Sequence, residues 1–180
     1  MKATGIVRRI DDLGRVVIPK EIRRAQRIRE GDPLEIFVGN DGEVVFKKYS
    51  PLKQLDQFAE SYAQSIYKAA GCSVLICDRD KVIAVAGKPK KDYLERPVSQ
   101  ELLNQKELRA GSVFTDKSAP RFRPVEGMDI VAAVACPILC AGDTVGYVVV
   151  PAVDGWPEIG DAECKLAMTA AVFLGTQMED

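Results

Sequence analysis

The sequence predicts an α+β protein of two domains, and three observations support this prediction. Short runs of β-branched residues alternate with turns over about the first 50 residues. Apolar residues then recur at helical spacing over residues 55–70. From residue 72 onward, pairs of strand-like segments alternate with helical ones. We therefore expect one domain at residues 1–50, a connecting amphipathic helix at 51–71 and a second domain at 72–180.

The first domain is expected to contain four short strands and one short helix. Pro19 has no N–H to donate, so it suits the beginning of a helix over residues 20–28. The turn sequence GNDG between two apolar runs predicts a hairpin. The four strand-like segments cover residues 4–10, 15–18, 33–38 and 43–49. So short a domain buries little surface by itself, and we expect a second copy to complete its core.

Positive charge is concentrated near the beginning of the chain. The 180 residues have a net charge of −1, yet residues 1–29 contain nine Lys and Arg against three Asp and Glu. This excess of six charges would double in a dimer and attract phosphate groups. The alternative is a solvated charged surface whose arginines form salt bridges with Asp11, Asp12 and Glu21.

A family resemblance rests on the run LGRVVIPKEIRR at residues 13–24, which joins a turn, a strand, a proline and a double arginine. With its flanking strand and the following hairpin, this run resembles the DNA-binding domain of the AbrB-type bacterial transition-state regulators. The resemblance implies a swapped-hairpin β-barrel, an intertwined dimer of exchanged strands that binds double-stranded DNA. It also implies DNA contacts by Arg8, Arg15, Arg23 and Arg24, with Lys20, Arg9 and Arg27 as additional candidates. Arginine suits this role because its rigid fork of donors engages phosphate or a guanine edge bidentately.

The second domain is expected to place helices against an antiparallel sheet. Strand-like segments cover residues 73–78, 81–87, 112–115, 130–138 and 144–153, and helical segments cover 98–111 and 161–178 with Asp161 as N-cap. This order of elements is similar to that of a GAF domain, an α/β sandwich that commonly senses a small molecule and contributes to dimer contacts. The pairing of the two domains resembles a family of sporulation regulators that activate and repress transcription.

Residues 117–127 form a polar stretch in which Arg121 and Arg123 flank Phe122. Two cations around an aromatic ring could hold an anionic or ring-bearing effector. The alternative is a solvated loop with Phe122 in the core.

The final helix is apolar on more than one face, which predicts a second association surface and a homotetramer. The alternative is that one domain buries both faces.

The five cysteines, an odd number, favour reduced thiols; they are Cys72, Cys77, Cys136, Cys140 and Cys164. Zinc at Cys136 and Cys140 is the alternative, but the chain has no histidine to complete such a site. The lack of histidine also removes the usual nucleophile–base pairs, so we expect no catalytic residues, metal or cofactor.

No run of 18 apolar residues occurs, and charges interrupt the first 20 residues. We therefore expect a cytoplasmic protein without a membrane partner. Three functions remain: a transcriptional regulator, an antitoxin that shares the swapped-hairpin domain, and an enzyme in the second domain. An antitoxin would usually end in a short acidic tail, whereas this chain continues into a long segment patterned to fold.

Overall fold

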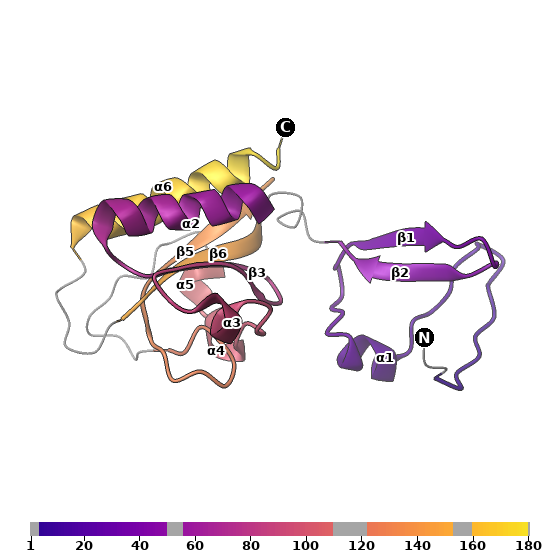
Figure 1. Cartoon of the computed structure of the whole chain (residues 1–180). Helices are drawn as coiled ribbons and strands as arrows, with labels where there is room; N and C mark the ends of the chain where they lie inside the picture. Colours follow the sequence, from indigo (N-terminus) through magenta and orange to yellow (C-terminus); the bar gives the residue numbers. More distant parts are fainter. Residues whose placement is uncertain (1–3, 50–55, 110–121, 153–159, 180) are drawn as a thin grey trace. The chain divides into compact units, whose positions relative to one another are not determined.

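The computed structural model of the chain describes residues 4–49, 56–109, 122–152 and 160–179 (Figure 1). The chain divides into two compact units, Met1–Tyr49 and Ser50–Asp180. Both contain helices and antiparallel strands, so the predicted α+β class is confirmed.

The first unit contains helix α1 (Lys20–Ala25) and a hairpin of β1 (Leu34–Val38) and β2 (Val44–Lys48). The strands are antiparallel, with Leu34 opposite Lys48 and Val38 opposite Val44. Gly42 has a φ of +77° in the turn, a conformation that glycine adopts without steric cost. The hairpin predicted from the GNDG turn is therefore confirmed.

Two of the four strands expected in this unit do not form within the single chain. Residues 4–10 and 15–18 make no strand pairing among the described residues, and their apolar side chains Val7 and Val17 are 86% and 71% exposed. A strand needs a neighbour to accept and donate its backbone hydrogen bonds, whatever its side-chain pattern. The described residues of one chain do not offer that neighbour.

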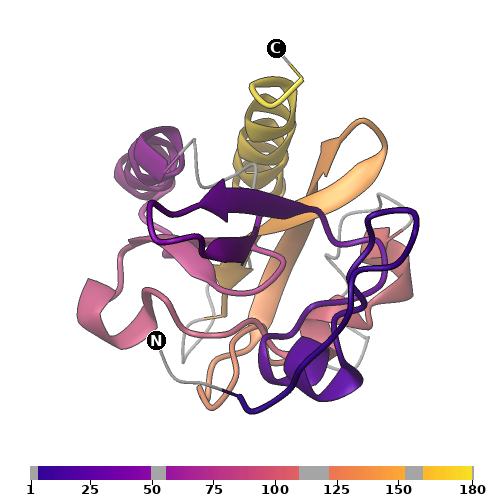
Figure 2. The same cartoon turned by 90° about the vertical axis from the view of Figure 1, so that its right-hand side faces the viewer.

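The second unit is built on a four-stranded antiparallel sheet in the order β4-β3-β6-β5. Helices α2 and α6 lie side by side on one face of this sheet, and short helices lie on the other (Figures 1 and 2). The elements are α2 (Asp56–Ala70), β3 (Val74–Asp78), β4 (Val82–Ala86), α3 (Lys90–Tyr93), α4 (Gln100–Leu103), α5 (Lys106–Arg109), β5 (Ala132–Cys140), β6 (Asp143–Pro151) and α6 (Asp161–Thr176).

Alternating residues of the sheet build two separate core layers. Val74 and Ile76 of β3 pack in the layer beneath α2 and α6. Their neighbours Leu75 and Cys77 pack in the opposite layer, with side chains of α3, α4 and α5. The sheet is therefore covered on both faces, and this unit has a complete core within one chain.

Helix α2 contributes directly to that core, because Ala59 and Ala63 are fully buried and Ile66 is nearly so. It ends as predicted at Gly71, which has a φ of +70° and donates its N–H to the Tyr67 carbonyl at 2.9 Å. The helix expected to connect two domains is thus an integral part of the second unit.

Other boundaries differ from the predictions. The helix expected over residues 98–111 forms as two short helices, α4 and α5, and Ser99 caps α4 by accepting the Leu102 N–H at 3.1 Å. Gly160 occupies the N-cap of α6, where its N–H donates to the Glu163 carboxylate at 2.9 Å, and Asp161 is the first helical residue. Helix α3 was not predicted. The strand expected at residues 112–115 lies outside the described residues.

Candidate DNA interface

All seven basic residues predicted to contact DNA belong to the first unit. They are Arg8 and Arg9 before the turn at Asp11, Arg15 after it, Lys20, Arg23 and Arg24 in α1, and Arg27 just beyond that helix. Six of them are exposed, and Arg23 is half-buried. The fold therefore presents nearly the whole predicted set to solvent.

The turn before Arg15 is organised by the Asp11 carboxylate. Its Oδ1 accepts the Leu13 N–H at 3.0 Å and the Arg15 N–H at 2.8 Å, and its Oδ2 accepts Arg15 Nε at 2.8 Å. Gly14 completes the turn with a φ of +75° and an N–H that donates to the Asp11 carbonyl at 3.0 Å. These bonds, first the Arg15 backbone N–H and then its guanidinium, lower the pKa of Asp11.

The salt bridges proposed as the alternative to DNA contact are present only in part. Arg15 pairs with Asp11. In the part of the chain that the structure describes, Arg8, Arg9, Arg23 and Arg24 have no ion-pair partner. Four guanidinium groups are thus not paired with any carboxylate among the described residues.

Helix α1 ends in a Schellman motif that places an arginine where glycine is usual. The Ile28 N–H donates to the Arg23 carbonyl at 2.7 Å, and the Arg27 N–H donates to the Arg24 carbonyl at 3.1 Å. Arg27 has a φ of +52°, which is unfavourable for a residue with a Cβ. The motif stops the helix at Ala25, one residue after the double arginine, and turns the chain toward the hairpin.

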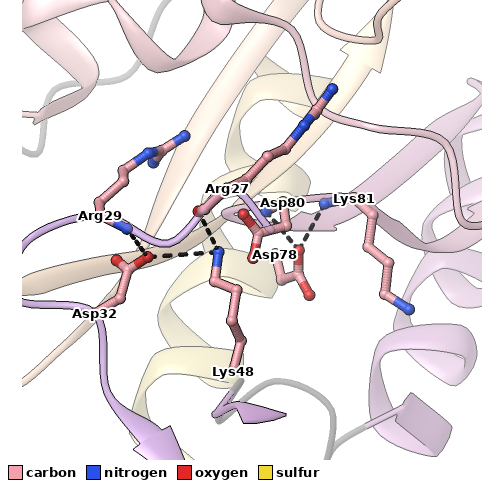
Figure 3. A network of polar contacts seen from close by, with 7 residues as sticks. All are labelled: Arg27, Arg29, Asp32, Lys48, Asp78, Asp80 and Lys81. Atoms are coloured by element: carbon pink, nitrogen blue, oxygen red, sulfur yellow. Dashed lines mark hydrogen bonds and ion pairs between the residues drawn. The ribbon is translucent and has the colours of Figure 1, made fainter. Parts of the chain in front are cut away.

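Polar contacts within the first unit tie the end of α1 to β2 (Figure 3). Asp32 Oδ2 accepts the Arg29 N–H at 2.8 Å and pairs with Lys48 Nζ at 3.5 Å, while Lys48 Nζ donates to the Arg27 carbonyl at 3.0 Å. The sequence analysis did not single out Asp32 or Lys48, because no local pattern connects residues so far apart. They support the helix that presents Arg23 and Arg24.

Figure 3 also includes a separate group in the second unit. Asp78 Oδ1 accepts the N–H groups of Asp80 and Lys81, each at 2.7 Å. These bonds close the turn between β3 and β4, which is a structural role within that unit.

The first unit exposes large apolar side chains as well as basic ones. Among its described residues only Pro19 is buried, whereas Val7, Val17 and Val38 are more than two thirds exposed. Twelve large exposed apolar side chains on so small a unit are typical of an interaction surface. The first unit therefore lacks a core of its own among the described residues, which is consistent with completion of the core by a second copy.

The effector residues predicted for the second unit occupy different environments. Arg121 lies outside the described residues. Phe122 is 3% exposed and packs in the core layer beneath α3 and α4, which is the position that the sequence analysis gave as the alternative. Arg123 pairs with Asp129 at 3.1 Å, and its N–H donates to Glu101 Oε2 at 2.7 Å. An effector site at these residues stays a prediction.

The cysteines are all free thiols. Burial raises the pKa of Cys136 to about 12, and burial also raises the pKa of Cys77 above its usual value. Such thiols remain protonated at neutral pH and are poor nucleophiles. The described residues include no group of three side chains able to hold a metal ion. None of the described helices has the length and apolar character needed to span a membrane.

The two units together define a class of protein: a basic unit with exposed apolar side chains, followed in the chain by an α/β sandwich with an antiparallel sheet. A family model described as "Stage V sporulation protein T C-terminal, transcription factor" matches residues 54–179. Another, described as "Antidote-toxin recognition MazE, bacterial antitoxin", matches residues 7–54. The chain belongs to the stage V sporulation protein T family of transcription factors.

Individual relatives support both halves of this assignment. The chain is 52% identical to stage V sporulation protein T of Bacillus subtilis (strain 168) over 179 residues, which cover 99% of each chain. It is 47% identical to the transition state regulatory protein AbrB of the same organism over 75 residues, or 42% of this chain and 77% of that one. The PixJ GAF domain of Thermosynechococcus elongatus matches 73% of this chain and 89% of its own with a TM-score of 0.54 at 12% identity. The GAF fold predicted for the second unit is therefore confirmed.

Proposed function

We propose that the chain acts in the cytoplasm as a DNA-binding regulator of sporulation genes, which it activates or represses, and that it has no enzymatic activity. The first unit, as an intertwined dimer, binds double-stranded DNA. One observation carries the proposal: Arg8, Arg9, Arg23 and Arg24 have no carboxylate partner in the described chain and belong to a segment with an excess of six positive charges.

Free guanidinium groups in a positive field suit the phosphate backbone, which supplies most non-specific affinity for DNA. Two copies would present eight such groups from these four positions. Removing one arginine removes two contacts per dimer, so the slope of log affinity against log salt should become less steep by about 1.8 for each phosphate-contacting position.

The test is a salt series on the full chain by fluorescence anisotropy. The probe is a duplex selected from a random pool by the wild-type protein. Arg23→Ala and Arg24→Ala should weaken binding and flatten the slope. The matched control is Arg96→Ala, which removes an exposed arginine of the second unit. Equal affinity and slope in all four proteins would exclude the proposed interface.

The second unit is proposed to add a further association, giving a tetramer, and to bind a small-molecule effector. Exposed Met168 and Val172 on α6 support the association. A hollow of about 550 Å³ beside Ser99, Glu101 and Arg123 supports the effector. Light scattering tests the first proposal, and thermal shifts with amino acids and nucleotides test the second. Light scattering that shows a dimer at micromolar concentration would exclude the tetramer. If none of the compounds raises the unfolding temperature, the second unit would be an oligomerisation scaffold and not a sensor.

The second candidate function is neutralisation of a toxin, which the match of residues 7–54 to the antitoxin model favours. Residues 54–179, which are 126 residues, match the model of a transcription factor instead. Co-purification of a small toxin with the full chain would support the antitoxin function, and purification of the chain alone with tight DNA binding would oppose it.

A further inference from the structure

We propose that Asp11 is a positioning residue for sequence discrimination, which holds Arg15 ready for a DNA base edge and disfavours contacts to phosphate alone. This inference rests on the proposed DNA-binding function and names the residue that would sharpen its specificity. The evidence is the geometry of one carboxylate that orders both the backbone and the side chain of Arg15.

Asp11 controls the conformation of Arg15 at two levels. Its Oδ1 accepts the Arg15 backbone N–H at 2.8 Å, and its Oδ2 accepts the side-chain Nε at 2.8 Å. The pair engages Arg15 from the side, through Nε. In the described part of the chain the terminal guanidinium nitrogens have no partner, and the Arg15 side chain is 69% exposed. The Arg15 guanidinium is therefore held through Nε, while its terminal N–H groups remain available to another acceptor.

Holding the side chain before binding reduces the conformational entropy lost on contact. A free arginine has many rotamers, and ordering it opposes association. A side chain already held by a short ion pair loses less freedom when its outer N–H groups meet two acceptors. A guanine edge offers such a pair of acceptors.

The charge of Asp11 acts differently on the two kinds of DNA contact. A carboxylate beside the arginine repels phosphate and so lowers the affinity for any duplex. A base contact depends more on the direction of the donors, which Asp11 improves. Asp11 would thus lower non-specific binding and support specific binding, and a difference between two affinities is what specificity requires.

Substitution by asparagine separates this role from capping of the turn. Asp11→Asn retains an oxygen able to accept the N–H groups of Leu13 and Arg15, and asparagine favours such turns. Its NH₂ group cannot accept a hydrogen bond from Arg15 Nε. The turn is kept and the side-chain pair is lost.

Asp12→Asn is the matched control. Asp12 is exposed in the same turn, and among the described residues it forms no hydrogen bond or ion pair. Its substitution removes the same charge one residue away without releasing Arg15. Arg15→Lys is the second variant, since lysine keeps the charge but lacks both Nε and the fork.

The experiment measures the affinity of the full chain for the selected duplex and for a scrambled duplex of the same composition. Because exposed ion pairs contribute little, we expect Asp11→Asn to lower the ratio of the two affinities by about threefold to fivefold. Asp12→Asn should raise both affinities and leave their ratio unchanged. In an Arg15→Ala background, Asp11→Asn should no longer change the ratio, because the pair is already broken.

Each outcome decides a different claim. If Asp11→Asn and Asp12→Asn give the same ratio while Arg23→Ala still weakens binding, the positioning role is wrong and the proposed function stands. If Asp11→Asn unfolds the protein, an unchanged ratio in Arg15→Lys likewise overturns the inference. If the wild-type chain selects no duplex and Arg23→Ala has no effect, both the inference and the proposed function fail.

Discussion

The two units of this chain use similar apolar residues with opposite results. All the buried apolar side chains of the described core belong to the second unit, whereas twelve of the seventeen large exposed ones belong to the smaller first unit. The second unit covers both faces of its sheet with its own helices. The first unit has a hairpin, a six-residue helix and two segments, 4–10 and 15–18, that form no strand pairing among the described residues. Apolar pattern alone therefore does not decide burial, since a surface to pack against must also be present.

The largest expected effect follows from the lack of a complete hydrophobic core in the first unit. Progressive dilution of the full chain should abolish hydrogen-exchange protection at β1 and β2, while β3 and β6 remain protected. A unit completed by a second copy loses stability by mass action, about 1.4 kcal/mol per dimer for each tenfold dilution. Hydrogen exchange monitored by mass spectrometry at several concentrations measures both regions in one sample. Protection of β1 and β2 that is independent of concentration would show that the first unit folds alone.

The second prediction tests how tightly the second unit is packed. A Cβ at Gly175 would lie 2.1 Å from the Leu139 carbonyl oxygen, so α6 would have to move away from β5. We expect Gly175→Ala to lower the free energy of unfolding of this unit by about 3 kcal/mol. Thr169→Ala, at an exposed position of the same helix, is the control and should stay within about 0.5 kcal/mol.

Urea denaturation of the full chain measures this effect. A Gly175→Ala protein as stable as the control would mean that α6 and β5 separate easily. The tight packing assigned to the second unit would then be wrong.

Buried thiols provide a third difference, because all five cysteines lie in the second unit. The pKa of Cys136 is raised from 9.0 to about 12, so the folded state keeps its proton in a pH range where the unfolded state loses it. Stability from this group is complete below pH 9 and is lost as the pH rises toward 12. The loss approaches about 1.4 kcal/mol per pH unit.

Urea denaturation between pH 7 and pH 10.5 follows this dependence. Cys136→Ala should make the decline above pH 9 shallower, with no change of slope between pH 7 and pH 8. The same decline in the variant and the wild type would mean that other groups cause it.

The smallest expected effect lies at the end of α1. Arg27→Gly should stabilise the first unit by about 1 kcal/mol relative to Arg27→Ala, since glycine relieves the cost of a positive φ and both variants lose the same charge. Thermal unfolding at one fixed protein concentration compares the two variants. An alanine variant as stable as the glycine variant would mean that the backbone relaxes at this position.

Local chemistry predicted much of the fold. The GNDG turn, the glycine at the end of α2 and the paired apolar runs of β3 to β6 each depend on residues close together in the sequence, and the structure contains all of them. The helix expected over residues 98–111 was wrong as one element, because two short helices fit the core layer around Leu102 and Leu108. The helical spacing of apolar residues does not indicate where one helix ends and the next begins.

The candidate interface was predictable to a similar extent. The sequence placed the basic residues on one short segment, and six of the seven are exposed. The alternative to DNA contact was a set of salt bridges to Asp11, Asp12 and Glu21, and among the described residues the pair with Asp11 is the one that forms. The support of α1 by Asp32 and Lys48 depends on contacts across the unit and has no local signature.

By itself the sequence determined the class of fold and the basic character of the first unit, because charge, turn residues and apolar periodicity act over a few neighbouring positions. The motif at residues 13–24 supplied the family resemblance. Only the tertiary structure decided that α2 belongs to the second core, that Phe122 is buried and that two expected strands find no partner among the described residues of one chain. Each of these outcomes depends on which segments of the chain pack or pair with one another. That choice is made by packing and hydrogen bonding between distant segments, and no local pattern records it.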